Sequence, residues 1–215
     1  VSAGEATRVA TGHTRDDQAE TVMLRLLRGA GAGGLAGILP VRDQVIARPL
    51  LRLDRTQLRS WLQEQGQPWR EDATNLDLHY SRNRMRAQAL PRLQAEFNPA
   101  LVARLCALAE VQRGEEAFWV DYLDPLLRAC GQPLAPGLRL PAEVLRALPL
   151  AVRRRLLRAA VAQVQGHLRQ VGFDMIEELL DWLDLPGTRP RVRRLGGLEC
   201  RVSRAGIEIR WRAEV

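Results

Sequence analysis

The chain has 215 residues, of which 46% are hydrophobic, so it can form one large or two small domains with real cores. Its formal net charge of +7 favours a polyanionic partner without identifying it. No apolar run approaches the roughly 18 residues of a membrane span and no signal peptide is visible, so we expect a cytoplasmic protein without membrane contact.

The basic residues and the cysteines further restrict the kinds of ligand and site that the protein can have. All 32 basic residues are arginines, whose planar guanidinium groups suit phosphates. Cys106, Cys130 and Cys200 lie far apart, without a Cys-x-x-Cys pair for a metal or an iron–sulfur cluster. An odd and sparse set of this kind indicates reduced thiols, as in the cytosol.

The first elements are a short strand and a helix. Thr7 to Thr11 (TRVAT) predicts a buried strand, and Gly29 is a natural helix terminator. Asp17 followed by Glu20 has the spacing of a capping box, so we expect a helix to begin at Asp17.

Acidic residues and a histidine gather at this junction between strand and helix, namely His13, Asp16, Asp17 and Glu20. Ligands of open α/β sheets bind at that edge of the sheet. Three carboxylates and a histidine so close together repel one another unless a cation lies among them. The alternative is that Asp17 caps the helix, Glu20 closes the box and the others face water.

The next segments are a glycine-rich run, a strand and a second helix. Gly29 to Gly37 (GAGAGGLAG) follows a helix, which excludes a dinucleotide fingerprint, and predicts a mobile loop. Residues 44–47 predict a strand. Asp54 then caps a helix that ends at Gly66, and we expect Leu58, Trp61 and Leu62 to face inward.

A basic helix follows from about Ser81 until Pro91. Arg82 and Arg86 share one face of it, four residues apart, which places two like charges together at a small energetic cost. A solvated face explains such a pair, but a phosphate between the two guanidinium groups explains it better.

The second half reads as helices and a closing hairpin. Asn98 and Pro99 suit a helix start, so we place a boundary between residues 95 and 96. The patterns predict helices over 99–122, 125–130, 142–147, 150–165 and 174–184, with breaks at Pro125 and in a 131–141 loop. Apolar and charged residues alternate over 198–203 and 207–211, which predicts a β-hairpin.

Four segments resemble one enzyme family: HTRDDQAET at His13, RPLL at Arg48, WREDATN at Trp69 and YSRNRMR at Tyr80. In order and approximate spacing they resemble tRNA(Ile)-lysidine synthetase, of the ATP pyrophosphatase (PP-loop) superfamily. The resemblance is specific over roughly residues 8 to 100 and looser beyond. It implies an α/β fold: part of a Rossmann-like ATP pyrophosphatase domain (1–95), then a mostly helical tRNA-binding domain ending in a β-hairpin (96–215).

The resemblance also implies a reaction. Members of the family use ATP, with Mg²⁺, to adenylate the wobble cytidine of a tRNA(Ile) with a CAU anticodon. Free L-lysine then displaces AMP to give lysidine. Adenylation is needed because a cytosine carbonyl oxygen leaves poorly, whereas AMP leaves well.

Roles follow from the resemblance and from charge. The resemblance implies catalytic roles for His13, Asp16, Asp17 and Glu20, with Asp17 and Glu20 recognising lysine. Carboxylate oxygens are also the ligands of Mg²⁺, so Asp17 is a candidate Mg²⁺ ligand. We expect ATP phosphate contacts for Arg82, Asn83 and Arg86. We expect backbone phosphates of tRNA to contact arginines of the second half, for each of which a solvated surface is the alternative: Arg153, Arg154, Arg158, Arg191, Arg193 and Arg194.

The sequence departs from the family in one respect. No segment matches the family's Ser-Gly-Gly-x-Asp-Ser phosphate loop, so we expect the latter part of a synthetase, inactive by itself. Two alternatives stay open. One is another ATP-dependent tRNA base-modifying enzyme, such as a thiolating one, although those often carry paired cysteines. The other is a non-catalytic basic RNA-binding module.

Overall fold

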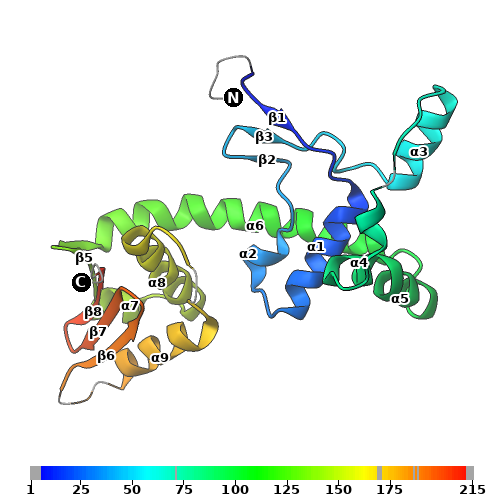
Figure 1. The fold of residues 1–215 in the computed structure, drawn as a ribbon. Helices are drawn as coiled ribbons and strands as arrows, with labels where there is room; N and C mark the ends of the chain where they lie inside the picture. The colour runs from blue at the N-terminus through cyan, green and yellow to red at the C-terminus, as the bar shows by residue number, and fades with distance from the viewer. Residues whose placement is uncertain (1–5, 71, 169–170, 186, 188, 212–215) are drawn as a thin grey trace. The chain divides into compact units, whose positions relative to one another are not determined.

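The computed structural model describes residues 6–70, 72–168, 171–185, 187 and 189–211 (Figure 1). Glu71 of the WREDATN segment lies outside these residues. The chain divides into two compact units, Val1–Ala117 and Phe118–Val215. This division falls within the long helix α6 (Leu101–Cys130), which contributes residues to both units, whereas the sequence places a domain boundary between residues 95 and 96.

Unit 1 contains a small mixed sheet of order β1-β3-β2. Strand β1 (Val9–Ala10) is parallel to β3 (Ile46–Ala47), and β2 (Val41–Arg42) is antiparallel to β3. Strands are therefore present where the sequence predicts them over 7–11 and 44–47, although they are shorter. The predicted burial of the first strand is wrong, because it lies at an edge of the sheet and Val9 is 46% exposed.

Helix α1 (Arg15–Leu27) begins earlier than predicted. Thr14 is the N-cap: its hydroxyl oxygen accepts from the backbone N–H of Asp17, and the Asp17 carboxylate accepts from the backbone N–H of Thr14. The predicted box that begins at Asp17 is therefore wrong by three residues. Asp17 closes the box, and Glu20 lies in the body of the helix on the same face, three residues on.

That face packs against a helical run in the second half of unit 1. The run comprises α4 (Ser81–Arg84), the π-helical turn η2 (Met85–Ala89) and α5 (Leu90–Glu96). The prediction that the helix ends at Pro91 is wrong, because Pro91 lies in the first turn of α5. The shared core of unit 1 contains Ala19, Val22, Met85, Leu90, Leu105 and Ala109.

The glycine-rich segment is not a loop throughout, because residues 32–35 form the short helix α2 (Ala32–Leu35). The Arg25 guanidinium donates to the carbonyl oxygens of Gly34 and Gly37, at 2.8 and 2.9 Å, and the Gln18 amide oxygen accepts from the Ile38 N–H at 2.6 Å. These bonds fasten the segment to α1.

Helix α3 (Arg55–Glu64) follows Asp54 as predicted, and the Gln57 side chain accepts from the Asp54 N–H. The prediction that Trp61 faces inward is wrong, since it is 58% exposed and no residue of α3 is buried. At the start of α3, the Asp54 carboxylate accepts from the Arg15 guanidinium and the Arg55 backbone N–H donates to Asp16, which joins this end of the helix to α1. After α3, the 3₁₀ turn η1 (Ala73–Leu76) precedes α4.

Unit 2 is an antiparallel sheet packed against helices, and α6 enters it without a break. Pro125 lies inside α6, so the predicted break there is wrong. The sheet order is β4-β5-β8-β7-β6. Its strands are β4 (Gln132–Leu134), β5 (Gly137–Pro141), β6 (Arg191–Leu195), β7 (Leu198–Ser203) and β8 (Gly206–Trp211). The predicted hairpin is confirmed as β7 and β8, whereas the predicted 131–141 loop forms β4 and β5.

Three predicted helices of unit 2 are confirmed to within one residue at each end: α7 (Ala142–Ala147), α8 (Leu150–Gln165) and α9 (Phe173–Asp184). They bury their apolar sides with the sheet residues Leu140, Ile207 and Ile209, which are fully buried. The architecture is therefore mixed α/β followed by helices and an antiparallel sheet. Among the described residues, no helix has both the length and the apolar character needed to cross a membrane.

Candidate active site

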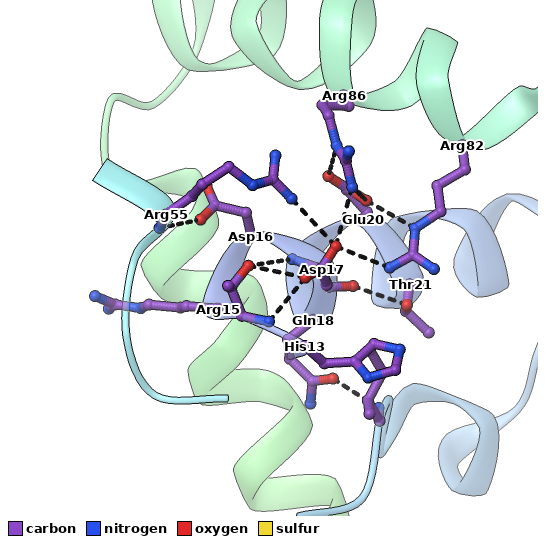
Figure 2. A network of polar contacts seen from close by, with 12 residues as sticks. His13, Arg15, Asp16, Asp17, Gln18, Glu20, Thr21, Arg55, Arg82 and Arg86 are labelled. Atoms are coloured by element: carbon purple, nitrogen blue, oxygen red, sulfur yellow. Dashed lines mark hydrogen bonds and ion pairs between the residues drawn. The ribbon is translucent and has the colours of Figure 1, made fainter. Parts of the chain in front are cut away.

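Two buried carboxylates on α1 face three arginines from other segments (Figure 2). Asp17 is 8% exposed and Glu20 is 1% exposed. Arg55 is the first residue of α3, Arg82 lies on α4 and Arg86 on η2. Residues 38 to 69 positions apart in the sequence therefore meet at one cluster.

Glu20 is held by two of these arginines. Arg86 binds it with two nitrogens, Nε to Oε1 at 2.6 Å and Nη2 to Oε2 at 3.0 Å. Arg82 adds a bond from Nε to Oε2 at 2.9 Å. A buried carboxylate needs this kind of compensation, because an unpaired charge away from water is costly.

Asp17 is the most heavily contacted group in the cluster. Its Oδ1 accepts from Arg86, Arg82 and Arg55 at 3.0, 3.1 and 3.3 Å, and its Oδ2 accepts from the N–H and hydroxyl of Thr14 at 2.7 and 2.9 Å. Burial acts to raise the pKa of Asp17, but the Thr14 donors and the charges of Arg82 and Arg55 outweigh it and hold the pKa below its usual value. Asp17 is thus a carboxylate at neutral pH.

The neighbouring Asp16 and His13 have different surroundings. Asp16 Oδ2 accepts from the backbone N–H of Arg55 at 2.8 Å, which anchors the start of α3. His13 Nδ1 lies 2.9 Å from the Thr11 hydroxyl. Burial lowers the pKa of His13, and Arg48 lowers it further against the opposing effect of Asp17, so the imidazole is neutral at pH 7.

The predicted phosphate-contacting residues divide into two groups. Arg82 and Arg86 point at the carboxylates of α1, and Arg86 also donates to the Asn75 side chain at 3.1 Å. Asn83 is 8% exposed, and its amide donates to the carbonyl oxygens of Thr74 and Asp77, both at 2.8 Å. Asn83 therefore fastens η1 to α4, apart from the carboxylate cluster.

The sequence patterns did not single out two members of the site, Thr14 and Arg55. The Thr14-x-x-Asp17 spacing is itself a capping-box signal and could have identified the first. Arg55 follows the helix cap Asp54, where the sequence alone does not show that a residue 38 positions away will be its partner.

The arrangement does not offer a ready Mg²⁺ site. Both oxygens of Asp17 and both of Glu20 already accept from protein donors. Over the described parts of the chain, no group of three or more His, Cys, Asp or Glu side chains is placed to hold a metal. The cations that relieve repulsion among the carboxylates are guanidinium groups of the protein itself.

Three of the predicted RNA-contacting arginines of unit 2 lie on α8, and each has a partner. Arg153 donates to Asp184 at 2.7 Å, and Arg158 donates to the carbonyl oxygen of Val171 at 3.0 Å. Arg154 binds both carboxylate oxygens of Glu177. Arg153 is only 9% exposed, so it is the buried partner of an ion pair whose Asp184 side chain is 46% exposed.

The other three lie on β6. Arg191 stacks over the Trp182 ring at 5.8 Å, Arg193 pairs with Glu178 at 3.4 Å and Arg194 pairs with Glu199 at 2.8 Å. The side chains of Arg193 and Arg194 stay 49% and 68% exposed. These two therefore remain accessible to an anion, and surface pairs of this kind contribute little to stability.

Comparison with known proteins agrees with both units. Residues 1–93 match the family model of the PP-loop domain, and residues 140–207 match that of the TilS substrate binding domain. The tRNA(Ile)-lysidine synthase of Solibacter usitatus (strain Ellin6076) is 46% identical over 206 residues, which cover 94% of this chain and 46% of that protein.

Further relatives carry the same name. That of Symbiobacterium thermophilum is 38% identical over 84% of this chain and 41% of its own length, and that of Thermosynechococcus vestitus is 34% identical over 95% and 59%. The chain belongs to the tRNA(Ile)-lysidine synthase family. It spans about half the length of the curated relatives that it matches. The resemblance seen in the HTRDDQAET, RPLL and YSRNRMR segments is thereby confirmed.

Proposed function

We propose that this chain supplies the lysine-recognition site and a tRNA-binding part of a cytoplasmic tRNA(Ile)-lysidine synthase. In the proposed reaction the carbonyl oxygen of the anticodon wobble cytidine attacks the α-phosphate of ATP and pyrophosphate leaves. The amine of free L-lysine then attacks the activated ring carbon, and AMP leaves with the former carbonyl oxygen. The products are lysidine, AMP and pyrophosphate.

The observation that carries the proposal is the pair of buried carboxylates on one face of α1, each paired with guanidinium groups. Asp17 and Glu20 lie three residues apart, and each already binds cationic groups. A lysine ammonium is a compact cation with three donors, and two adjacent carboxylates offer it opposite charge and accepting oxygens. Held there, the lysine gains the advantage of proximity for the displacement step.

The surroundings of His13 suit a role next to a phosphate. The neutral imidazole lies within the electrostatic influence of Arg48 and Arg82. Positive charge at this position favours an adenylate phosphate, and a neutral His13 can exchange a proton with a reacting group. We assign Arg82 and Arg86 to phosphate contacts and Asn83 to the support of their helix.

ATP brings the activating chemistry, and Mg²⁺ commonly accompanies its phosphates as part of the substrate. Because no group of three or more His, Cys, Asp or Glu side chains in the described part of the chain is placed to hold a metal, we assign no Mg²⁺ ligand to this cluster and no step to the metal. The described residues act on charge and position instead: they hold the ammonium, balance the phosphate and keep the amine close.

The tRNA with its CAU anticodon is assigned to the arginine-rich surface. Basic residues exceed acidic ones both in residues 1–95 (14 against 10) and in residues 96–215 (18 against 15), so both halves attract a polyanion. Within the predicted set, we favour the exposed Arg193 and Arg194 over the buried Arg153 for direct phosphate contacts. Unpaired anticodon bases can leave the loop and enter a pocket, as RNA bases commonly do.

The test is lysine transfer by a chimeric enzyme. The 206 matched residues of the Solibacter usitatus relative are replaced by those of this chain. The relative supplies the rest of the protein. We expect ATP-dependent incorporation of isotope-labelled lysine into tRNA(Ile) with a CAU anticodon. Incorporation of sulfur rather than lysine would favour a thiolating enzyme, and RNA binding without incorporation a non-catalytic module.

A matched pair of variants makes the test specific for the site. Glu20→Gln in the chimera should reduce lysine use at least a hundredfold, because it removes a carboxylate that faces an ammonium. Glu96→Gln, which alters an exposed ion pair with Arg92, should leave lysine transfer unchanged. Equal activity of the two variants would contradict the assignment of Glu20.

A further inference from the structure

The lysine site is already filled by the protein. Both oxygens of Asp17 and both of Glu20 accept from Thr14 or from guanidinium groups at 2.6–3.3 Å. An ammonium cannot bind these oxygens at full strength unless a donor withdraws. If the proposed function is right, lysine binding must therefore be an exchange of one cation for another.

The contacts indicate which cation withdraws. Of the two carboxylates Asp17 and Glu20, the Arg55 guanidinium contacts Asp17, so its withdrawal does not open a place at Glu20. Arg86 reaches both carboxylates, but it makes three contacts with them and one with Asn75, and its side chain is 25% exposed.

Arg82 also reaches both carboxylates, through a single bond to each: Nε to Glu20 at 2.9 Å and Nη2 to Asp17 at 3.1 Å. Its side chain is 42% exposed, the highest value of the three arginines. Arg82 therefore contacts both carboxylates through fewer bonds than Arg86 does. It is also the most exposed of the three arginines. In the view of Figure 2, Arg82 and Arg55 reach the carboxylates from opposite sides.

Charge balance indicates what makes Arg82 withdraw. Asp16, Asp17 and Glu20 carry three negative charges, and Arg55, Arg82 and Arg86 carry three positive ones. An added ammonium leaves one positive charge uncompensated in a partly buried cluster, which is unfavourable. A phosphate bound by the withdrawn Arg82 supplies the missing negative charge.

We propose that Arg82 couples the two ligands: it pairs with Asp17 and Glu20 when the site is empty and turns to a phosphate when an anion arrives, which opens both carboxylates to lysine. This inference rests on the proposed function and adds an order to it. Lysine binds well only after a phosphate group is present, so the amine is delivered to an activated nucleotide. By thermodynamic reciprocity lysine must strengthen anion binding by the same factor.

The coupling is measured on the 215-residue chain with inorganic pyrophosphate as the anion. Lysine is titrated by calorimetry with and without saturating pyrophosphate at matched ionic strength, and norleucine, which lacks the side-chain ammonium, serves as the control ligand. We expect pyrophosphate to strengthen lysine binding about tenfold or more, within the usual range of ligand coupling, and to leave norleucine unaffected.

Two variants separate the coupling from a structural role. In Arg82→Gln, lysine should bind without pyrophosphate about as tightly as it binds wild type with pyrophosphate, and the anion effect should vanish. Arg84→Gln removes a charge from the same helix, at a side chain that donates to the carbonyl oxygens of Leu78 and His79, and should keep the anion effect.

Three results would overturn the inference: no anion effect in wild type, an equal effect in Arg82→Gln, or no lysine binding under any condition. A purely structural Arg82 would give the second result together with a lower melting temperature. Lysine transfer by the chimera decides separately about the function. A chimera that transfers lysine while the chain shows no coupling refutes only the exchange, whereas a chimera that transfers none refutes the function itself.

Discussion

Replacing Glu20 by glutamine tests whether the cluster stabilises unit 1. Glu20 is 1% exposed and accepts three charge-assisted bonds, from Arg86 Nε and Nη2 and from Arg82 Nε. The amide of glutamine has one oxygen that can accept, but its NH₂ group would face a guanidinium donor. Glu20→Gln therefore removes the charge and one of the two accepting oxygens, so at least one guanidinium donor loses its partner at this position.

The loss of stability depends on how deeply Glu20 is buried and on the partners that Arg82 and Arg86 keep after the substitution. Breaking a buried ion pair by removing one partner costs about 3–5 kcal/mol. Here the cost is smaller, because Arg82 and Arg86 are 42% and 25% exposed and both keep Asp17. We expect Glu20→Gln to lower the free energy of unfolding by about 2–3 kcal/mol.

The assay is urea denaturation followed by circular dichroism, with Glu96→Gln as the matched control. The Glu96 pair with Arg92 is exposed on both sides, so its loss should cost at most about 0.5 kcal/mol. A double-mutant cycle with Arg86→Gln should show a coupling energy between Glu20 and Arg86 of about 1 kcal/mol or more. Equal stability of Glu20→Gln and Glu96→Gln would refute the buried cluster.

Three further predictions concern pH, backbone and salt. Because the pKa of Asp17 is lowered in the folded protein, its stabilisation is complete above the unfolded value of about 3.9 and is lost as pH falls through the folded pKa. In urea denaturation the stability gap between wild type and Asp17→Asn should therefore narrow below about pH 4, and a constant gap would contradict this. Gly137 has φ +142° and a Cβ there would lie 2.1 Å from the Ile209 carbonyl oxygen, so Gly137→Ala should cost roughly 3 kcal/mol. Gly166→Ala, at φ +79° in open space, should cost only about 1–2 kcal/mol, and equal losses in thermal melts would contradict the close contact. If about six phosphates are neutralised, tRNA affinity in filter binding should fall about three orders of magnitude between 50 and 200 mM salt, whereas a flat dependence would rule out the arginine footprint.

Local sequence signals predicted the elements that depend on local chemistry. Asp54 with Gln57 marks α3, and alternating residues mark the β7–β8 hairpin. Prolines misled the prediction at two places, since Pro125 lies inside α6 and Pro91 in the first turn of α5. Pro91 stands in a first turn, where its missing N–H costs little, whereas Pro125 lies inside a helix against the local preference of proline.

Local sequence patterns could not predict the elements that depend on pairing with residues far away in the sequence. The prediction that the 131–141 segment is a loop missed β4 and β5, because β5 is a strand through its pairing with β8, which lies about 70 residues later. Likewise, the sequence predicts RNA contacts for the arginines of β6, but it did not show that they lie on a strand. In the structure β6 forms an edge of the sheet and pairs with β7. An arginine-rich run can serve as a strand and still present exposed guanidinium groups.

The acidic cluster shows the same limit at the candidate site. The sequence groups Asp16, Asp17 and Glu20 and predicts either a cation among them or a capping role with the others facing water, whereas in the structure three arginine side chains contact Asp17 or Glu20. It placed the arginines at 82 and 86 with a separate ligand, a phosphate, because sequence spacing does not show which opposite charges will meet. If a guanidinium of this set binds carboxylates in the empty site and a phosphate in the occupied site, both the observed ion pairs and the predicted phosphate contact are explained. The Arg82 guanidinium, which compensates the two buried carboxylates in the empty site, would then also respond to the presence of the activated nucleotide.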